Sequence, residues 1–408
     1  MFRSLGEARR QYPHQFWFLF WGMLINAAGT SMIWPFLTIF LRQQLGVSLT
    51  TVAGLMTLNA VMTLLSSFIA GPFADRFGRK GVMVLSLTAG SVGYVLMSQA
   101  HTLPAFAALM ALNGLMSPLY RVGADAMVAD LIPPEKRLDA YSLLRMINNA
   151  GVAIGPSVGG FVAVASYTVA FYVAASCMGI YAFLVIFFIA ETLSRLPAPR
   201  QEGEAASMGY GEILKDRLFL SFCGCLAMIT MSIAMMFILL SVYTKENYGI
   251  PENQYGFIMA TNAVMVVFVQ YFVTQITRNR PRFWVLAVGA LLYSLGVGSV
   301  ALGRGFFGFL ASMVVVTFGE LVTVPTATTL TANLAPPDMR GRYMSIYGLT
   351  WGIGTGIGPV IGGLLNDLIA PVAIWYGGLA IGLVGFLGFV ILARRNPAVA
   401  SRLPEDAG

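Results

Sequence analysis

Charged residues are scarce in this chain of 408 residues: they make up 11% of it, whereas hydrophobic residues make up 57%. An ordinary soluble domain carries about 25% charged residues. A chain with so little charge and a mean hydropathy of +0.75 would expose a large apolar surface to water. The composition therefore excludes a soluble protein and predicts a membrane protein with many spanning segments.

Cysteine and histidine are also rare. Cys177, Cys223 and Cys225 all lie in apolar runs, so none of them is expected to form a disulfide in a loop. The two histidines, His14 and His101, lie at the ends of apolar runs, and neither a His-Glu-x-x-His pattern nor a phosphate-binding Gly-x-x-x-x-Gly-Lys pattern occurs. We therefore expect no catalytic residues, no metal site and no cofactor, and we predict that the chain is not an enzyme.

Twelve apolar runs of helical length fill most of the chain. About 20 residues of helix cross a bilayer, and these runs are too long for the strands of a barrel. They are expected at residues 16–42, 49–72, 82–100, 103–130, 139–164, 168–190, 219–245, 253–276, 283–302, 306–333, 342–366 and 372–393. The predicted fold class is an all-α integral membrane protein with twelve transmembrane helices.

Lysine and arginine are distributed unequally between the two sides of these runs. Twenty lie at one set of ends, only Arg42, Lys245 and Arg304 lie at the other, and two lie inside the runs. The positive-inside rule then places both termini and the even-numbered loops in the cytoplasm, with the chain in the cell membrane. The net charge of +7 therefore reports topology, and no nucleic acid partner is expected.

The two halves of the sequence repeat each other at an offset of 203 residues. Residues 127–160 align without gaps to residues 330–363 with 12 of 34 positions identical, and Asn59-Ala-Val-Met matches Asn262-Ala-Val-Met. Six helices in each half make this a parallel repeat, which predicts two six-helix bundles around a central cavity. The expected division is a bundle at 1–193, a cytoplasmic linker at 194–217, a second bundle at 218–396 and a cytoplasmic tail at 397–408.

The segment after the second run reads GPFADRFGRK, from Gly71 to Lys80. It resembles the helix 2–3 signature of the major facilitator superfamily, and the twelve spans and the repeat extend that resemblance over nearly the whole chain. The resemblance implies a conformational latch in which Arg79 pairs with the carboxylate that ends the fourth helix, here Asp130. Gly71 would let a neighbouring helix approach closely. The expected latch residues are Gly71, Asp75, Arg76, Gly78, Arg79 and Asp130; an ordinary charged turn is the alternative.

The fifth run carries glycines four residues apart, and the eleventh run repeats the pattern. It resembles the signature of the drug:proton antiporter branch of the same superfamily. Small residues at this spacing let helices pack tightly and proline bends them, so plain packing is the alternative explanation. The residues concerned are Gly151, Gly155, Pro156 and Gly159, with Gly354, Gly358, Pro359 and Gly362 in the second half.

Four ionisable residues fall inside the predicted helices, where a charge is costly and therefore indicates function. Arg121 and Asp125 are one helical turn apart, and we expect them to form one ion-pair cluster with Arg145. A purely structural ion pair is the alternative. Glu320 lies in the middle of its run without a basic residue nearby on that run. It is the first candidate for proton coupling, and Asp125 is the second; the alternative for Glu320 is a permanently protonated side chain bonded to a neighbour.

In the superfamily, the first, fourth, seventh and tenth helices line the substrate cavity. The resemblance therefore implies a cavity lined by Asn26, Thr30, Trp34, Asn113, Ser117, Met228, Met231 and Met235. Methionine adapts to varied apolar ligands, although a methionine stripe also suits packing or contact with lipid. The mixture suits an amphiphilic substrate, and the excess of arginine at Arg121 and Arg145 favours an anionic head group.

These features predict a secondary active transporter that uses alternating access to export a hydrophobic or amphiphilic small molecule in exchange for protons, as multidrug antiporters do. The proton gradient would be the driving force. A lipid or glycolipid translocator and a sugar or metabolite exporter are alternatives on the same fold, and a channel or receptor is the alternative outside transport. The expected partners are the substrate, protons and the lipid bilayer, and the chain is expected to be a monomer.

Overall fold

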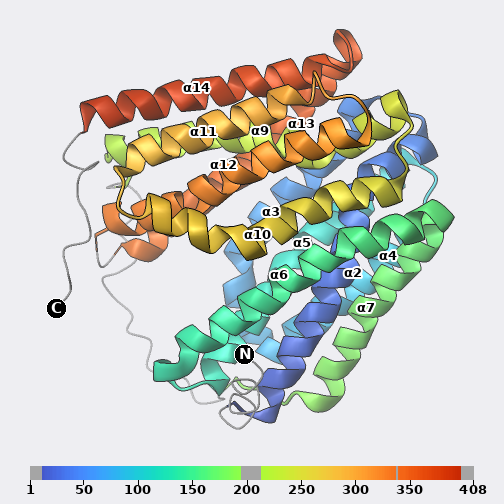
Figure 1. The fold of residues 1–408 in the computed structure, drawn as a ribbon. Coiled ribbons are helices and arrows are strands. Elements are labelled where there is room, and N and C mark those ends of the chain that lie inside the picture. The colour runs from blue at the N-terminus through green and yellow to red at the C-terminus, as the bar shows by residue number, and fades with distance from the viewer. Residues whose placement is uncertain (1–11, 194–212, 337–338, 397–408) are drawn as a thin grey trace. The chain divides into compact units, whose positions relative to one another are not determined.

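The computed structural model describes residues 12–193, 213–336 and 339–396 (Figure 1). Within these ranges it contains twelve helices long and apolar enough to cross a membrane, and no strand. The all-α class with twelve spanning helices is thus confirmed. The helices are α2 (His14–Leu45), α3 (Leu49–Phe77), α4 (Arg79–Gln99), α5 (Leu103–Leu131), α6 (Pro134–Ala165), α7 (Tyr167–Phe188), α9 (Arg217–Tyr248), α10 (Glu252–Thr277), α11 (Arg282–Ser299), α12 (Gly305–Leu334), α13 (Arg340–Leu368) and α14 (Ala373–Arg395).

The chain divides into two compact units. The first contains residues 1–46, 58–198 and 251–260, and the second contains residues 47–57, 199–250 and 261–408. The start of α3, at 47–57, therefore belongs to the second unit, and the start of α10, at 251–260, belongs to the first. The division expected from the sequence does not include this exchange of segments. Most of the expected linker, at 194–212, and the expected tail lie outside the described residues.

Glycines on one face of α6 let the first unit pack tightly. A Cβ atom added at Gly151 would lie 2.7 Å from Ala27 Cβ, and one at Gly155 would lie 2.7 Å from the carbonyl oxygen of Ala28. Any larger side chain at these positions would push α2 and α6 apart. This spacing holds α2 against α6 and sets the position of the polar residues on the neighbouring face of α2.

The second unit uses the repeated glycines in the same way. A Cβ atom at Gly354 would lie 2.6 Å from Thr230 Cβ, and one at Gly358 would lie 3.0 Å from Met231 Cα. The Thr230 hydroxyl donates a hydrogen bond to the carbonyl oxygen of Thr350 across the same contact, 2.8 Å away. The glycine pattern of α6 and α13 thus has a packing role in both units.

A cluster of buried apolar side chains holds together one end of the first unit. Phe16, Met83, Met127 and Tyr181 are each 0% exposed and come from α2, α4, α5 and α7, and Leu144 of α6 packs with them. Because all five helices contribute, their ends are held in a fixed arrangement. The charged residues at these ends are positioned by this cluster.

Candidate functional site

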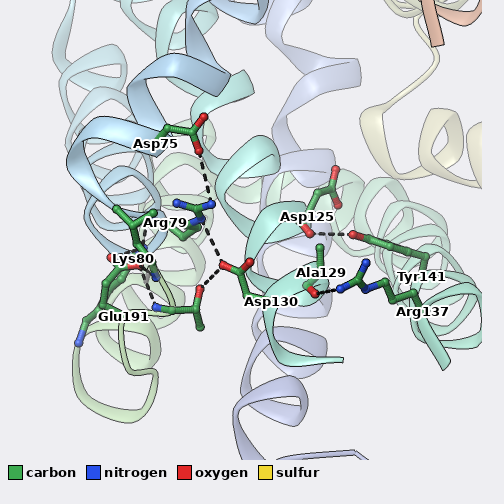
Figure 2. Close-up of polar contacts among 11 residues, drawn as sticks. Asp75, Arg79, Lys80, Asp125, Ala129, Asp130, Arg137, Tyr141 and Glu191 are labelled. Carbon is green, nitrogen blue, oxygen red and sulfur yellow. Dashed lines mark hydrogen bonds and ion pairs between the residues drawn. The ribbon is translucent and has the colours of Figure 1, made fainter. Parts of the chain in front are cut away.

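Arg79 lies between two carboxylates where α3 gives way to α4 (Figure 2). Its guanidinium is 3.2 Å from Asp130 at the end of α5 and 3.4 Å from Asp75 on α3. The Arg79 side chain is 15% exposed, Asp130 is 33% exposed and Asp75 is 71% exposed. The structure thus brings together the arginine and the helix-ending carboxylate that the resemblance implies, and Asp130 is the better shielded of its two partners.

Glu191, which the sequence reasoning missed, completes this charged group. Its carboxylate accepts hydrogen bonds from the backbone N–H groups of Arg79 and Lys80, each 3.1 Å away. These are free donors at the start of α4, where the helix dipole also favours a negative charge. Thr192, the next residue, donates from its hydroxyl to Asp130 at 2.8 Å. In the sequence, Glu191 stands out only as an isolated acid directly after the sixth apolar run. The tertiary structure is needed to place it beside the start of α4.

Gly78 is required at this turn for two reasons. Its φ angle is +87°, a region that other residues rarely adopt, and an added Cβ atom would lie 2.9 Å from Glu191 Cδ. Gly71 behaves differently: an added Cβ atom there meets nothing within 4 Å. Within the first unit, no neighbouring helix therefore approaches α3 closely at Gly71, and the close approach expected there stays a prediction. Arg76 is exposed, with its guanidinium 5.7 Å from the ring of Phe77.

The end of α5 is tied to α6 by hydrogen bonds to carbonyl oxygens (Figure 2). Arg137 donates to Ala129 at 2.6 Å and to Ile132 at 3.0 Å, and the Tyr141 hydroxyl donates to the backbone oxygen of Asp125 at 2.8 Å. The last carbonyl groups of a helix have no partner within that helix, so these bonds stabilise the helix end. They keep Asp130 in place beside Arg79.

The ion-pair cluster expected from Arg121, Asp125 and Arg145 is not formed. No ion pair joins any two of the three in the part of the chain that the structure describes, and all three side chains are exposed. The charges of Arg121 and Asp125 nevertheless lie near enough to attract each other, although no direct ion pair joins the two side chains. One turn of separation on α5 allows Arg121 and Asp125 to meet but does not require it.

The first unit contains a cavity of about 520 Å³ that is open on one side. Its walls come from α2, α3, α4, α5, α6 and α7, and twelve of its nineteen lining residues are polar. Five residues expected to line a substrate cavity do lie on its walls: Asn26, Thr30, Trp34, Asn113 and Ser117. The cavity is therefore a polar space with an apolar portion, large enough for a small organic molecule.

Asn59 on α3 organises one wall of this cavity. Its amide nitrogen donates to the carbonyl oxygen of Met110, 2.9 Å away, and to the side-chain oxygen of Asn113, 3.4 Å away. The repeat that matches Asn59 with Asn262 is the sequence signal for this residue, although the repeat alone indicates duplication and not a contact. The contacts show that the matched asparagine connects α3 to α5.

The three methionines expected to line the cavity lie on α9 in the second unit, and two of them belong to its core. Met235 is 0% exposed, and its sulfur lies 3.5 Å from where a Cβ atom of Gly378 would be. Met231 is 8% exposed, and its backbone contacts Gly358. The cavity interpretation is wrong for Met231 and Met235, because the glycines of α13 and α14 bring those helices onto this face of α9. Met228 is half-buried.

Glu320 on α12 is partly buried, and it has polar partners from another helix. Its carboxylate oxygen accepts a hydrogen bond of 2.7 Å from the amide nitrogen of Asn262 on α10. The same nitrogen lies 3.1 Å from the Thr317 hydroxyl. Over the residues that the structure describes, Glu320 makes no ion pair. It is thus an intramembrane acid held by neutral groups rather than neutralised by a cation.

No metal centre is evident in the described ranges, which contain no group of three or more His, Cys, Asp and Glu residues placed to bind an ion. The polar groups of the cavity are amides, hydroxyls and one guanidinium. Such groups bind organic molecules by hydrogen bonding and charge.

Twelve spanning helices, a polar cavity within the bundle and isolated charges in the helices are features of membrane transport proteins. The family model of the Major Facilitator Superfamily matches residues 19–300 and 220–408. The chain belongs to the Major Facilitator Superfamily, as the resemblance implied, and its family and fold are those of secondary transporters.

Curated relatives cover nearly the full length of the chain. A "Na(+), Li(+), K(+)/H(+) antiporter" of Planococcus maritimus is 28% identical over 376 residues, which are 85% of this chain and 86% of the relative. "Multidrug resistance protein MdtH" of Yersinia enterocolitica is 26% identical over 398 residues, which are 95% of this chain and 94% of the relative.

Solved structures share the fold at low sequence identity. The nucleoside transporter NupG superposes with a TM-score of 0.78 at 11% identity, over 93% of this chain and 100% of that one. A bacterial homologue of the human lysosomal transporter Spinster, in an inward-facing conformation, gives a TM-score of 0.76 at 14% identity, over 95% of this chain and 96% of that one. These similarities support the fold and leave the substrate open.

Proposed function

We propose that this protein is a proton-coupled antiporter that exports an amphiphilic small molecule across the cell membrane, with Glu320 as the coupling acid. The termini would face the cytoplasm, as the distribution of lysine and arginine predicts. The charged group around Arg79 would act as the latch that holds one conformation of the transport cycle. The names of the antiporter and multidrug relatives agree with this proposal.

The environment of Glu320 is the observation that carries the proposal. A carboxyl group in the middle of a spanning helix is expensive to ionise unless a cation or water compensates for the charge. Here the amide of Asn262 donates a hydrogen bond to Glu320, and the same amide also donates to the hydroxyl of Thr317. Both groups are neutral. Such a carboxyl group can hold a proton when it is shielded and release it when the transport cycle opens it to water.

The Glu320→Gln substitution tests the coupling. Glutamine keeps the shape of the protonated side chain but cannot release a proton, so substrate accumulation driven by a pH gradient should fall to background while downhill exchange persists. Transport into proteoliposomes, with and without an imposed pH gradient, measures both activities for a panel of fluorescent amphiphiles.

Glu246→Gln is the matched control, because Glu246 is an exposed acid at the end of α9. It should retain gradient-driven accumulation. If Glu320→Gln still concentrates a substrate against its gradient, Glu320 is not the coupling acid, and Asp125 becomes the residue to test.

A second candidate cargo is a monovalent cation, and it is favoured by the name of the Planococcus relative. The same proteoliposomes decide between the two cargoes. Dissipation of a pH gradient on addition of Na⁺, Li⁺ or K⁺ alone would identify cation exchange, whereas dissipation only with an amphiphile supports the first proposal.

A further inference from the structure

We propose that the cavity of the first unit binds the head group of an anionic amphiphile that carries several O–H or N–H donors. Arg121 would face the negative charge, and a ring of hydrogen-bond acceptors would face the donors. This inference rests on the proposed transport of an amphiphile and adds the chemistry of its head group.

The charge of the cavity wall points to an anion. Arg121 is the one charged residue among those that line the cavity, and no carboxylate lines it. Asp125 lies one turn farther along α5, outside the lining. Its charge interacts with that of Arg121, but no direct ion pair joins the two in the described chain, so the guanidinium remains available to a ligand. A guanidinium at the wall of a cavity within the bundle, without an ion-pair partner, attracts an anionic group and disfavours a cationic one.

The hydroxyl groups of the wall are mostly committed as donors. Thr30 donates to the carbonyl oxygen of Asn26 at 2.8 Å, Ser31 to that of Ala27 at 2.6 Å, and Thr63 to that of Asn59 at 2.9 Å. Ser67 and Ser86 also donate to backbone oxygens. A hydroxyl that has donated its hydrogen offers only acceptor lone pairs to a ligand. These five hydroxyl groups therefore favour ligands with hydrogen-bond donors.

Asn26 provides an independent sign that something is to be bound. The residue is 9% exposed, it lines the cavity, and its side-chain oxygen has no hydrogen-bond partner. Leaving a buried acceptor unpaired is unfavourable, and nearly all such atoms in folded proteins are satisfied. A donor group on the ligand would satisfy it.

The remaining wall accommodates the apolar part of the same molecule. Trp34 presents a side chain that is 42% exposed, and Met116, Val152 and Met178 add aliphatic surface. An indole ring stacks well on a flat apolar or sugar ring. An anionic head group with several hydroxyls, joined to an aromatic or aliphatic body, matches this combination.

Three fluorescent probes that share the methylumbelliferyl ring test the inference. Methylumbelliferyl β-D-glucuronide carries both a negative charge and hydroxyl donors. Methylumbelliferyl β-D-glucoside lacks the negative charge, and methylumbelliferyl sulfate lacks the hydroxyl donors. Binding is measured by titration of the full chain in lipid nanodiscs. The glucuronide should bind more tightly than either other probe. Equal affinity for the glucuronide and the glucoside would overturn the inference.

Two substitutions separate the contributions of charge and hydrogen bonding. Arg121→Gln should weaken glucuronide binding about tenfold, the effect of losing one charge-assisted hydrogen bond, and leave glucoside binding unchanged. Asn26→Leu should weaken both sugar probes and spare the sulfate. Arg145→Gln, an exposed arginine outside this cavity, is the control and should change nothing. Unchanged glucuronide binding in Arg121→Gln would remove the role of Arg121.

The same measurements distinguish this inference from the proposed function. Tight glucuronide binding without gradient-driven transport would support the head-group site while rejecting proton coupling. Proton-driven transport of a cationic dye by a protein that does not bind the glucuronide would overturn the head-group site and leave the coupling proposal standing.

Discussion

Arg79 has two acidic neighbours whose surroundings differ. Asp130 is 33% exposed, lies 3.2 Å away and also accepts a hydrogen bond from Thr192, whereas Asp75 is 71% exposed and lies 3.4 Å away. Solvent and salt screen an exposed ion pair far more than a shielded one. Of the two ion pairs of Arg79, the one with Asp130 should therefore contribute most of the stability.

The Asp130→Asn substitution should destabilise the protein more than Asp75→Asn does. Loss of the Asp130 charge leaves a largely buried guanidinium short of its nearer partner, which costs about 1–3 kcal/mol. Loss of the Asp75 charge should cost less than about 0.5 kcal/mol. Unfolding in detergent, followed by tryptophan fluorescence, measures both changes, and equal shifts in the two variants would contradict this account.

At the scale of the element, the turn between α3 and α4 depends on a tertiary cap. The start of α4 has no side-chain cap of its own, and Glu191 supplies its acceptors from beyond the end of α7. Gly78 makes this possible through its positive φ angle and its lack of a side chain. The turn of the superfamily signature is therefore completed by a residue about 110 positions away in sequence.

The Gly78→Ala substitution should destabilise the turn by about 2 kcal/mol, because alanine is strained at positive φ and its Cβ atom would displace Glu191 from the helix start. Gly71→Ala is the control within the same signature. Its Cβ atom meets nothing within 4 Å, so the change should be neutral or stabilising by up to about 1 kcal/mol, as expected for alanine inside a helix.

Thermal unfolding of the two glycine variants in the same detergent provides the comparison. A Gly78→Ala variant as stable as the parent would show that the Glu191 cap is not needed. A large loss of stability in Gly71→Ala would mean that another helix approaches α3 there after all.

At the scale of the whole molecule, the predicted membrane orientation rests on charge rather than on packing. Twenty lysine and arginine residues lie at one set of helix ends and three at the other. Each basic cluster resists translocation, and the clusters all agree with one another. The protein should therefore adopt a single topology.

Cysteine labelling tests this orientation. Thr102→Cys and Glu135→Cys place thiols at exposed positions between α4 and α5 and at the start of α6, in a variant whose native cysteines are replaced. A membrane-impermeant maleimide should label Thr102→Cys in intact cells and Glu135→Cys only after permeabilisation. The reverse pattern would invert the topology, and labelling of both in intact cells would reject a single orientation.

Much of the architecture could be predicted from the sequence, because the spanning helices are specified by local properties. Apolar runs of about 20 residues have few alternatives to a helix in a bilayer. The duplicated glycines four residues apart likewise favoured tight packing of α6 and α13, since only small residues permit backbone contact. The pairing of Arg79 with Asp130 came from the family resemblance.

The contacts that define the candidate sites depended on the tertiary structure. The resemblance assigned Met235 to a cavity wall, but a methionine on the same helix can equally well pack in the core, where Met235 is 0% exposed. Arg121 and Asp125 are spaced to pair but form no direct ion pair in the described chain. Glu191 and Asn262 meet partners contributed by other helices. Such contacts depend on how each helix is rotated and offset against its neighbours, and that is set by the sum of many small packing energies between residues distant in sequence.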